Sequence, residues 1–459
     1  MRYPRVMRAF HYHSIVLMFY AFGAATALAS DWSDSVKVKV DDIVAKHFKN
    51  RTQVGVVVGV IHGDETHIWN YGERIFGTGE TPGGDTFFEM GSITKTFTNT
   101  LLALEVNRGR VRLEDQVQTL WPELRGTDAG AITLEQLATH TSGLPRMPDN
   151  FLPADPLNPY KDYDEGLLLA FLKGFRQKEA GPYPCSYSNL GMGLLGHLIA
   201  SKLNRTEFRA YLQSNLTGPL GMGDTKVALQ SSDFSRAAQG YGSFFNLIPF
   251  WDLNVLEPAG VLKTTAIDLI KYTRFNMRPD SSPLGEAAEL AQKPRKKADS
   301  DGVMVGLGWF STKLGDHSVV THAGATGGYR ANLVFDREDQ LGFVVLSNTD
   351  ISPDCVGAPI FGVECRVPEW KATDPEIQKQ LIGVYHSEPL RMTLTIFVDH
   401  GILGLQQDNY RIRLFSKSDT EFESPEIEAS FIFKLDQSGQ GSQFTLLQGG
   451  GSYDFVRLN

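Results

Sequence analysis

Three short motifs contain residue types that could together carry out acyl transfer. Ser92 and Lys95 stand three residues apart, a Tyr-Ser-Asn motif follows at 187–189, and a His-Ala-Gly motif lies at 322–324. A serine hydroxyl is a poor nucleophile without a neighbouring base, and a partly desolvated, neutral lysine can be that base. The motifs therefore offer a nucleophile, a base and further polar groups for one site.

The Ser-x-x-Lys motif opens a predicted helix. Apolar residues recur at helical spacing over 92–108, and Gly109 can end the helix. Residues three apart share a helix face, so Ser92 and Lys95 would be neighbours. Free N–H groups at the helix start favour a developing negative charge. Alone, this spacing would more often mean an N-cap serine and a solvated lysine.

The other two motifs add groups that could act on a substrate. Tyr187 could relay a proton between the serine oxygen and a leaving group, and the Asn189 amide could hold a substrate amide. His322 and Gly324 follow the apolar run 318–321, and a strand ending in small residues lets a substrate lie along its edge. Taken singly, this tyrosine and this histidine would more often be packing residues.

Strand patterns at both ends of residues 31–350 predict one sheet with helices between its strands. The strand segments are 54–61, 67–72, 306–311, 318–321, 330–335 and 341–347. Helical patterns separated by proline and glycine turns lie between them, as at 167–175 and 191–202. This order predicts an α+β fold with a helical subdomain.

The pattern changes near residues 366–375. Short alternating segments separated by glycine and serine turns follow, at 392–398, 401–406, 410–414, 430–435, 443–447 and 453–458. Regular short strands of this kind predict a small antiparallel barrel or sandwich.

The composition is that of a folded, acidic protein. Hydrophobic residues make up 42% of the 459 residues and charged residues 21%, which suits two or three packed domains. The formal net charge is −9 without a basic run, which argues against nucleic acid as a partner. No metal-ligand motif is recognised beyond the first 29 residues.

Residues 1–29 read as a signal peptide. Arg2, Arg5 and Arg8 precede an uncharged apolar run, and Ala27-Leu28-Ala29 fits a cleavage site before Ser30. The run is short for a stable membrane span, although an uncleaved anchor is the alternative. We therefore expect an exported protein, periplasmic or secreted.

Three cysteines are present, and export would allow a disulfide. Cys355 and Cys365 flank a loop and could pair, which would leave Cys185 as a small buried residue. Spacing alone does not decide the pairing.

Four segments carry a resemblance to a known family. Residues 88–124 (FEMGSITKTF onward), 132–145, 187–196 and 322–336 closely resemble class C β-lactamases, and equally their relatives, the DD-peptidases, D-aminopeptidases and β-lactamase-like esterases. The resemblance covers residues 50–350. It implies the penicillin-recognising serine-hydrolase fold, an antiparallel sheet flanked by helices, over a domain of residues 31–367. It implies no cofactor.

The tail at 371–459 resembles the lipocalin-like C-terminal domains of some of these hydrolases, through LIGVYHSE and the closing YDFVRLN. Such a domain could shape substrate access, assist assembly or only stabilise the chain. The sequence does not indicate an oligomeric state.

The resemblance also implies roles for single residues. Ser92 would be acylated, Lys95 and Tyr187 would handle its proton, and Asn189 would bind the substrate amide. The backbone N–H groups of Ser92 and Ala325 would form the oxyanion hole.

The third motif departs from the class C pattern. Class C enzymes carry Lys-Thr-Gly where this chain has residues 322–324. His322 would supply a donor in place of the lysine, but Ala323 lacks the hydroxyl that helps bind a substrate carboxylate. Arg330 and Arg146 are candidates to compensate.

The substrate remains open at this point. Small-molecule or peptide substrates are expected: D-amino-acid peptides of cell-wall type, or β-lactams. A carboxylesterase is the closest rival, and the aromatic residues at 244, 245, 250 and 251 could form its acyl pocket or belong to the core. A penicillin-binding sensor that acylates without turnover is the third reading.

Overall fold

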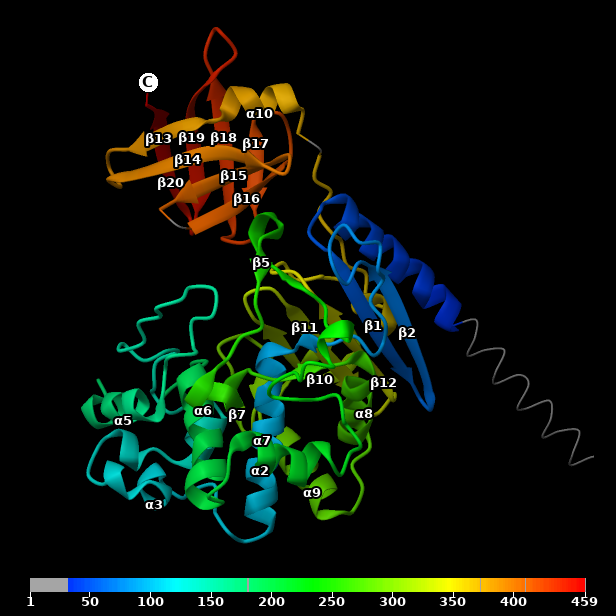
Figure 1. The fold of residues 1–459 in the computed structure, drawn as a ribbon, viewed down its shortest axis with the longest axis vertical. Helices are drawn as coiled ribbons and strands as arrows, with labels where there is room; N and C mark the ends of the chain where they lie inside the picture. Colours follow the sequence, from blue (N-terminus) through cyan, green and yellow to red (C-terminus); the bar gives the residue numbers. More distant parts are fainter. Residues whose placement is uncertain (1–31, 180, 372, 409, 459) are drawn as a thin grey trace, which may run out of the picture.

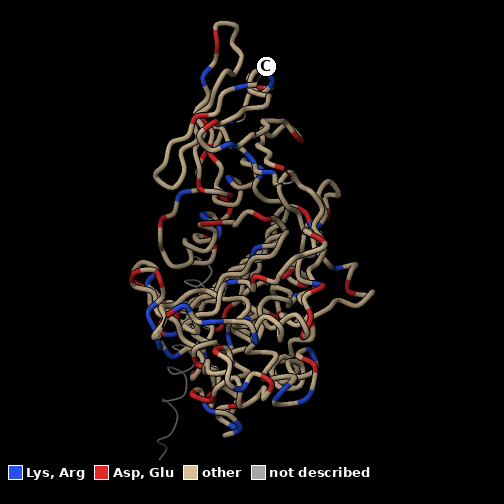
Figure 2. Tube along the Cα trace, turned by 90° about the vertical axis from the view of Figure 1, so that its left-hand side faces the viewer, with Lys and Arg blue, Asp and Glu red and all other residues tan. Residues whose placement is uncertain are grey.

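The computed structural model describes residues 32–179, 181–371, 373–408 and 410–458, and it shows a helix-and-sheet body with a barrel at one end (Figure 1). The predicted signal peptide lies outside the described residues. Among the described helices, none is long and apolar enough to cross a membrane. Acidic and basic residues are interspersed along the chain (Figure 2).

The larger body is built on an eight-stranded antiparallel sheet in the order β2-β1-β12-β11-β10-β9-β8-β7. The strands are β1 (Gly55–His62), β2 (Glu65–Gly72), β7 (Lys296–Lys297), β8 (Met304–Val305), β9 (Phe310–Leu314), β10 (His317–Ala325), β11 (Arg330–Asp336) and β12 (Leu341–Ser347). Strands from both ends of the domain thus join one sheet, which confirms the predicted α+β plan.

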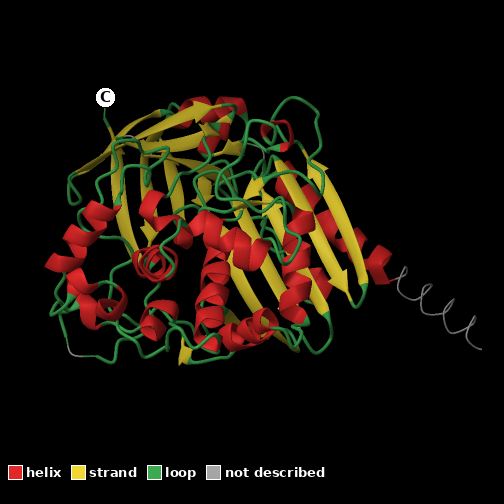
Figure 3. Cartoon of the chain, turned by 60° about the horizontal axis from the view of Figure 1, so that its bottom comes forward, coloured by secondary structure: helices red, strands yellow, loops and turns green. Residues whose placement is uncertain are grey.

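The two faces of this sheet are covered differently. Helices α2 (Thr94–Asn107), α8 (Ala266–Met277) and α9 (Pro283–Gln292) belong to the layer that covers one face. Figure 3 shows helices lying in front of the sheet. The helix at 32–49 and the segment 351–367 cover the other, where Val345 and Phe361 belong to one apolar cluster.

Helix α2 lies inside the domain. Every residue from Thr94 to Glu105 is buried, so this helix is enclosed on all sides rather than amphipathic. Its threonine hydroxyls are satisfied; Thr98, for example, donates to the Pro258 carbonyl at 2.8 Å. The predicted helix start at Ser92 is instead the 3-10 turn η1 (Gly91–Ile93), which precedes α2.

Short elements make up the helical subdomain and the connections. The helical ones are α3 (Val117–Leu120), η2 (Pro122–Leu124), η3 (Ala129–Ala131), α4 (Leu134–Ala138), α5 (Glu165–Gly174), α6 (Asn189–His197), η4 (Leu198–Leu203), α7 (Phe208–Leu212), η5 (Gln213–Thr217), η6 (Phe234–Arg236), η7 (Ser243–Phe245), η8 (Asn254–Ala259) and η9 (Ala358–Phe361). Two small pairs, β3 (Phe88–Glu89) with β6 (Lys263–Thr264) and β4 (Gly240–Tyr241) with β5 (Leu247–Ile248), complete the body.

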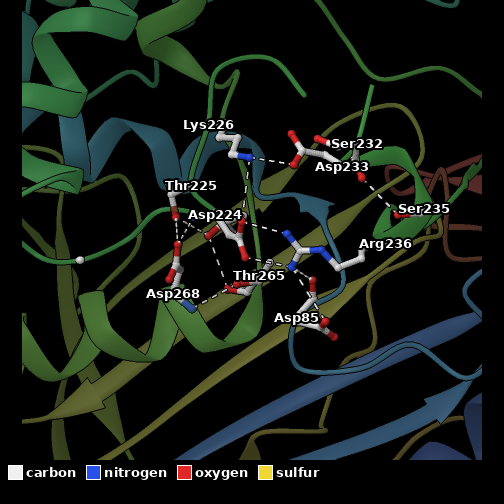
Figure 4. Close-up of polar contacts among 12 residues, drawn as sticks. Asp85, Asp224, Thr225, Lys226, Ser232, Asp233, Ser235, Arg236, Thr265 and Asp268 are labelled. Atoms are coloured by element: carbon white, nitrogen blue, oxygen red, sulfur yellow. Dashed lines mark hydrogen bonds and ion pairs between the residues drawn. The ribbon is translucent and has the colours of Figure 1, made fainter. Parts of the chain in front are cut away.

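A polar network holds the chain ahead of β4 against α8 (Figure 4). The Arg236 guanidinium contacts both carboxylate oxygens of Asp224, at 2.9 and 3.0 Å. Lys226 pairs with Asp233 at 2.8 Å, and Asp268 of α8 accepts the backbone N–H of Asp224 at 2.8 Å. These contacts fix a long connection that has little regular structure of its own.

The C-terminal strands close into an antiparallel barrel, as predicted, after the short helix α10 (Pro375–Leu381). The strands are β13 (Gly383–Ser387), β14 (Met392–Asp399), β15 (Ile402–Gln407), β16 (Tyr410–Ser416), β17 (Glu421–Ser424), β18 (Ala429–Leu435), β19 (Gly441–Gln448) and β20 (Gly451–Arg457). Aromatic side chains fill its centre, among them Phe422, Phe433 and Phe444.

An aromatic contact joins the barrel to the larger body. The loop that contains η7 reaches the barrel wall (Figure 1), where the Phe244 ring lies 5.1 Å from that of Phe397 and beside Arg411. Gly404 makes room for this ring, because a Cβ there would collide with it. Phe244 is therefore part of the domain junction, not of an acyl pocket.

A buried charge cluster lies at the same junction. Arg413 has no exposed surface and contacts Asp350 at 2.6 Å and Glu426 at 2.7 Å. Asp350 follows β12, whereas Glu426 belongs to the barrel, so the arginine bridges the two bodies.

We expect Arg413→Met to lower the free energy of unfolding by about 3–5 kcal/mol, because it leaves two nearly buried carboxylates without their partner. Urea unfolding followed by tryptophan fluorescence measures this loss. Lys379→Met is the matched control, since its ion pair with Glu376 is exposed and should be worth less than about 1 kcal/mol. Equal losses in the two variants would contradict the prediction.

Candidate active site

The structure brings Ser92 and Lys95 into direct contact. Ser92 lies in η1 and Lys95 in the first turn of α2, and Lys95 Nζ is 2.9 Å from Ser92 Oγ. The same amine donates to the Ala259 carbonyl of η8 at 2.6 Å. These two contacts aim the lysine at the serine hydroxyl.

Lys95 is fully enclosed by protein. Burial, together with the nearby charge of Arg146, holds the pKa of Lys95 well below its usual value. A buried amine of this kind is available in its neutral form, which is the form that can accept the serine proton.

Tyr187 lies over the same amine. Lys95 Nζ is 4.8 Å from the centre of the Tyr187 ring, and the Arg146 guanidinium is 5.1 Å from it. Burial raises the pKa of Tyr187 to about 12, against the opposing effect of a hydrogen bond with Ser92. The phenol therefore keeps its proton at neutral pH and can donate it.

Ser188 and His140 hold the tyrosine in place. Ser188 caps α6 by accepting the Gly191 N–H at 2.9 Å, and its hydroxyl donates to the Pro145 carbonyl at 2.7 Å. The His140 ring lies 4.5 Å from that of Tyr187, and its Nδ1 accepts the Ser188 N–H at 3.2 Å. The sequence motifs do not single out His140, because its role depends on this tertiary contact.

Two glycines let β10 approach the nucleophile turn. A Cβ on Gly324 would collide with the Met90 carbonyl and lie 3.1 Å from the Ser92 nitrogen. Gly91 has φ +49°, and a Cβ there would lie 2.5 Å from the Ala325 nitrogen. The N–H groups of Ser92 and Ala325 therefore come from adjoining segments, as an oxyanion hole requires.

His322 lies on β10 within reach of this site. Its ring centre is 6.4 Å from that of Tyr187, and its Nδ1 is 2.6 Å from the Ala323 carbonyl. Burial and the charge of Lys95 lower the pKa of His322 to about 3, so the imidazole is neutral. Because Nδ1 must donate its only N–H to the Ala323 carbonyl, Nε2 is left as an acceptor, and His322 supplies neither the expected donor nor the positive charge of a lysine.

Asn189 begins α6 beside Tyr160. Its Nδ2 lies 3.4 Å from the Tyr160 hydroxyl, whereas its buried Oδ1 has no hydrogen-bond partner among the described residues. The side chain can therefore accept a substrate N–H.

The two candidate arginines are placed differently. Arg146 is exposed and lines the cavity beside Tyr187. Arg330 also lines the cavity, but its guanidinium donates to the carbonyls of Thr326 and Tyr329, at 2.8 and 2.9 Å. It pairs with Ala325, on the opposite face of β10 from Gly324. The structure thus brings Arg146, not Arg330, to the serine side.

A cavity of about 1030 Å³ contains the site. Ser92, Tyr187, Asn189, His322 and Ala325 line it. Trp251, one of the aromatic residues considered for an acyl pocket, also lines it, as does Tyr160, which the sequence did not indicate. Cys355 and Cys365, which form a disulfide, also reach this cavity, while Cys185 is free and buried.

Comparison with known proteins agrees with this geometry. Residues 40–359 match the family model described as Beta-lactamase. The chain is 27% identical to a beta-lactamase of Pseudomonas fluorescens over 346 residues, which cover 68% of this chain and 93% of that protein. The barrel lies beyond the matched residues.

Two solved structures share the fold. A class C beta lactamase from Rhodobacter sphaeroides has a TM-score of 0.62 at 24% identity, covering 70% of this chain and 97% of that one. A protein described as Beta-Lactamase/D-Alanine Carboxypeptidase from Pseudomonas syringae has a TM-score of 0.63 at 22% identity, covering 71% and 97%. Since the family model spans well over half of the sequence, the chain belongs to the β-lactamase family of serine hydrolases.

Proposed function

We propose that this hydrolase is exported and forms an acyl-enzyme on Ser92 from D-amino-acid peptides of cell-wall type or from β-lactams. The observation that carries the proposal is the 2.9 Å contact between Ser92 Oγ and the buried Lys95 amine. The N-terminal signal pattern and the Cys355–Cys365 disulfide support export.

The acylation step follows from the protonation states. Neutral Lys95 takes the proton of Ser92 as Oγ attacks the substrate carbonyl carbon, and the N–H groups of Ser92 and Ala325 stabilise the resulting oxyanion. Collapse breaks the bond to the leaving group, which takes a proton from Tyr187. The lysine proton then restores the tyrosine.

Deacylation uses the same groups. A water molecule attacks the acyl ester and gives its proton to the neutral Lys95 amine, and Ser92 Oγ then leaves with that proton as the acid is released. A sensor would stop before this step.

The polar groups of the cavity suit a peptide substrate. Asn189 can accept a substrate N–H, and Arg146 offers a cation for a carboxylate. The protein described as Beta-Lactamase/D-Alanine Carboxypeptidase shares this fold, which is compatible with either substrate class.

The rival carboxylesterase is favoured by a different observation. His322 is neutral and Ala323 has no hydroxyl, so the third motif lacks the usual means of holding a carboxylate. A substrate without a carboxylate would lose no binding contact at the third motif.

Intact-protein mass spectrometry tests the acyl-enzyme. We expect residues 30–459 to form a covalent adduct with a fluorescent penicillin, and Ser92→Ala to form none. Turnover of a D-Ala-D-Ala peptide by the unmodified enzyme, with release of D-alanine, would separate a peptidase from a sensor. If penicillin is neither bound nor hydrolysed while a short-chain aryl ester turns over through Ser92, the carboxylesterase replaces the peptidase or β-lactamase as the proposed function.

The pH dependence of kcat/KM tests the base. We expect an acid limb that reports loss of the Lys95 proton and a plateau reached well below the usual lysine pKa of about 10.4, because the neutral amine is the active form. Since the pKa of Tyr187 is about 12, the plateau should extend through pH 9.

Two variants control this profile. Tyr187→Phe should lower the plateau by about 10²–10⁴-fold and leave the acid limb in place. Lys95→Arg should remove nearly all activity, since a guanidinium stays protonated. A wild-type rate that still climbs at pH 10 would exclude Lys95 as a neutral base.

The third motif is tested by restoring the class C lysine. His322→Lys should raise kcat/KM for penicillin acylation by tenfold or more, on the order of one added charged hydrogen bond. Stopped-flow acylation kinetics measure it, with short-chain ester turnover as the control for intact folding. An unchanged or lower penicillin rate with normal ester turnover would contradict this reading of the motif.

A further inference from the structure

The cavity that holds Ser92 extends to both faces of the sheet. His322 pairs with Leu333, and both face the catalytic side, whereas Ala323 pairs with Asn332 one position along. Alternate residues of a strand point to opposite faces. Since His322, Ala323 and Asn332 all line the cavity, it has a rear compartment on the far side of β10.

The two compartments meet at an open strand edge. Strand β9 pairs with β10 only as far as Thr321, opposite Phe310. Residues 322–325 of β10 therefore have no paired strand on that side within the described chain. A substrate chain can pass this edge without breaking a ladder.

Two cross-strand rows form the floor of the rear compartment. Thr321, Val334 and Phe343 make one row, and Ala323, Asn332 and Val345 make the other. The segment 352–358 and Cys365 form the roof. Ala323 is exposed and Asn332 is half-buried although β10 and β11 lie in the middle of the sheet, so the roof does not fill the space.

The lining of this compartment is mainly apolar, although Arg330, which turns to this face, and Asp354 of the roof also line the cavity, and one buried acceptor is unmet. Val319, Val334, Phe343, Val345 and Val356 supply its apolar lining. The buried Asn332 Oδ1 has no hydrogen-bond partner among the described residues. A buried carbonyl oxygen without a hydrogen bond costs free energy, so a ligand N–H that donates to this atom would be favourable.

We propose that the rear compartment binds an apolar chain of the substrate, joined to the rest by an amide whose N–H meets Asn332 Oδ1. The inference rests on the proposed function, because it takes the substrate carbonyl to be bound at Ser92. From there the apolar chain extends past the edge of β10 into the rear compartment. It assigns N-acylated or otherwise apolar-tailed amides as the preferred substrates.

Binding without turnover tests the proposal. The full chain with Ser92→Ala is titrated by calorimetry with N-acetyl-, N-butanoyl- and N-octanoyl-glycinamide. We expect affinity to rise at least about tenfold from butanoyl to octanoyl, as burial of methylene groups requires. Affinity that does not depend on chain length would overturn the proposal.

Two further variants locate the chain. Ser352→Trp narrows the compartment from its exposed roof and should remove the chain-length effect, whereas Ser352→Ala should keep it. Asn332→Leu should weaken the octanoyl amide but not the matching octanoyl ester of glycolamide, which lacks the N–H. An octanoyl affinity unchanged in Ser352→Trp would place the chain elsewhere and overturn the assignment.

This experiment is independent of catalysis. If Ser92 of the wild-type chain forms no acyl-enzyme, the proposed function fails while chain-length-dependent binding can still be present. If acylation occurs but binding shows no chain-length effect, only the rear compartment is lost.

Discussion

The burial of one amine beside one hydroxyl is the constraint on which the rest of the site depends. Lys95 can act as a base only while water is kept from it, and its two short contacts come from Ser92 on η1 and from the Ala259 carbonyl on η8. An enclosed α2 is needed for this, because a helix on the surface would leave the ammonium solvated and charged. The helices around α2 therefore matter for chemistry as well as for packing.

The same enclosure sets the charge pattern around the substrate. His322 shares the desolvated environment of Lys95, so its imidazole stays neutral and cannot replace the lysine of the class C motif. Arg146, on the more open side of Tyr187, is left as the cation that faces the serine. Substrate choice thus follows from burial as much as from residue identity.

The barrel and the rear compartment are linked through one stretch of chain. Asp350, which pairs with Arg413 at the barrel junction, directly precedes the segment that roofs the compartment. The Cys355–Cys365 disulfide lies within that segment, and Phe244 anchors a second loop to the barrel wall. The barrel therefore holds the chain just ahead of the roof, and it contributes no side chain to the cavity lining described above.

Spacing and alternation along the chain were enough to single out the three motifs and to predict the α+β plan and the C-terminal barrel, because both are local properties of the sequence. The contact between Ser92 and Lys95 was predictable for the same reason, since three residues span one helical turn. Three features follow from tertiary contacts instead. Arg330 turns to the far face and Phe244 packs at the barrel junction. Gly91 and Gly324 let β10 approach the turn that carries Ser92. Those outcomes depend on contacts between segments far apart in the sequence. The pattern of residues along the chain does not specify which distant residues a side chain will contact.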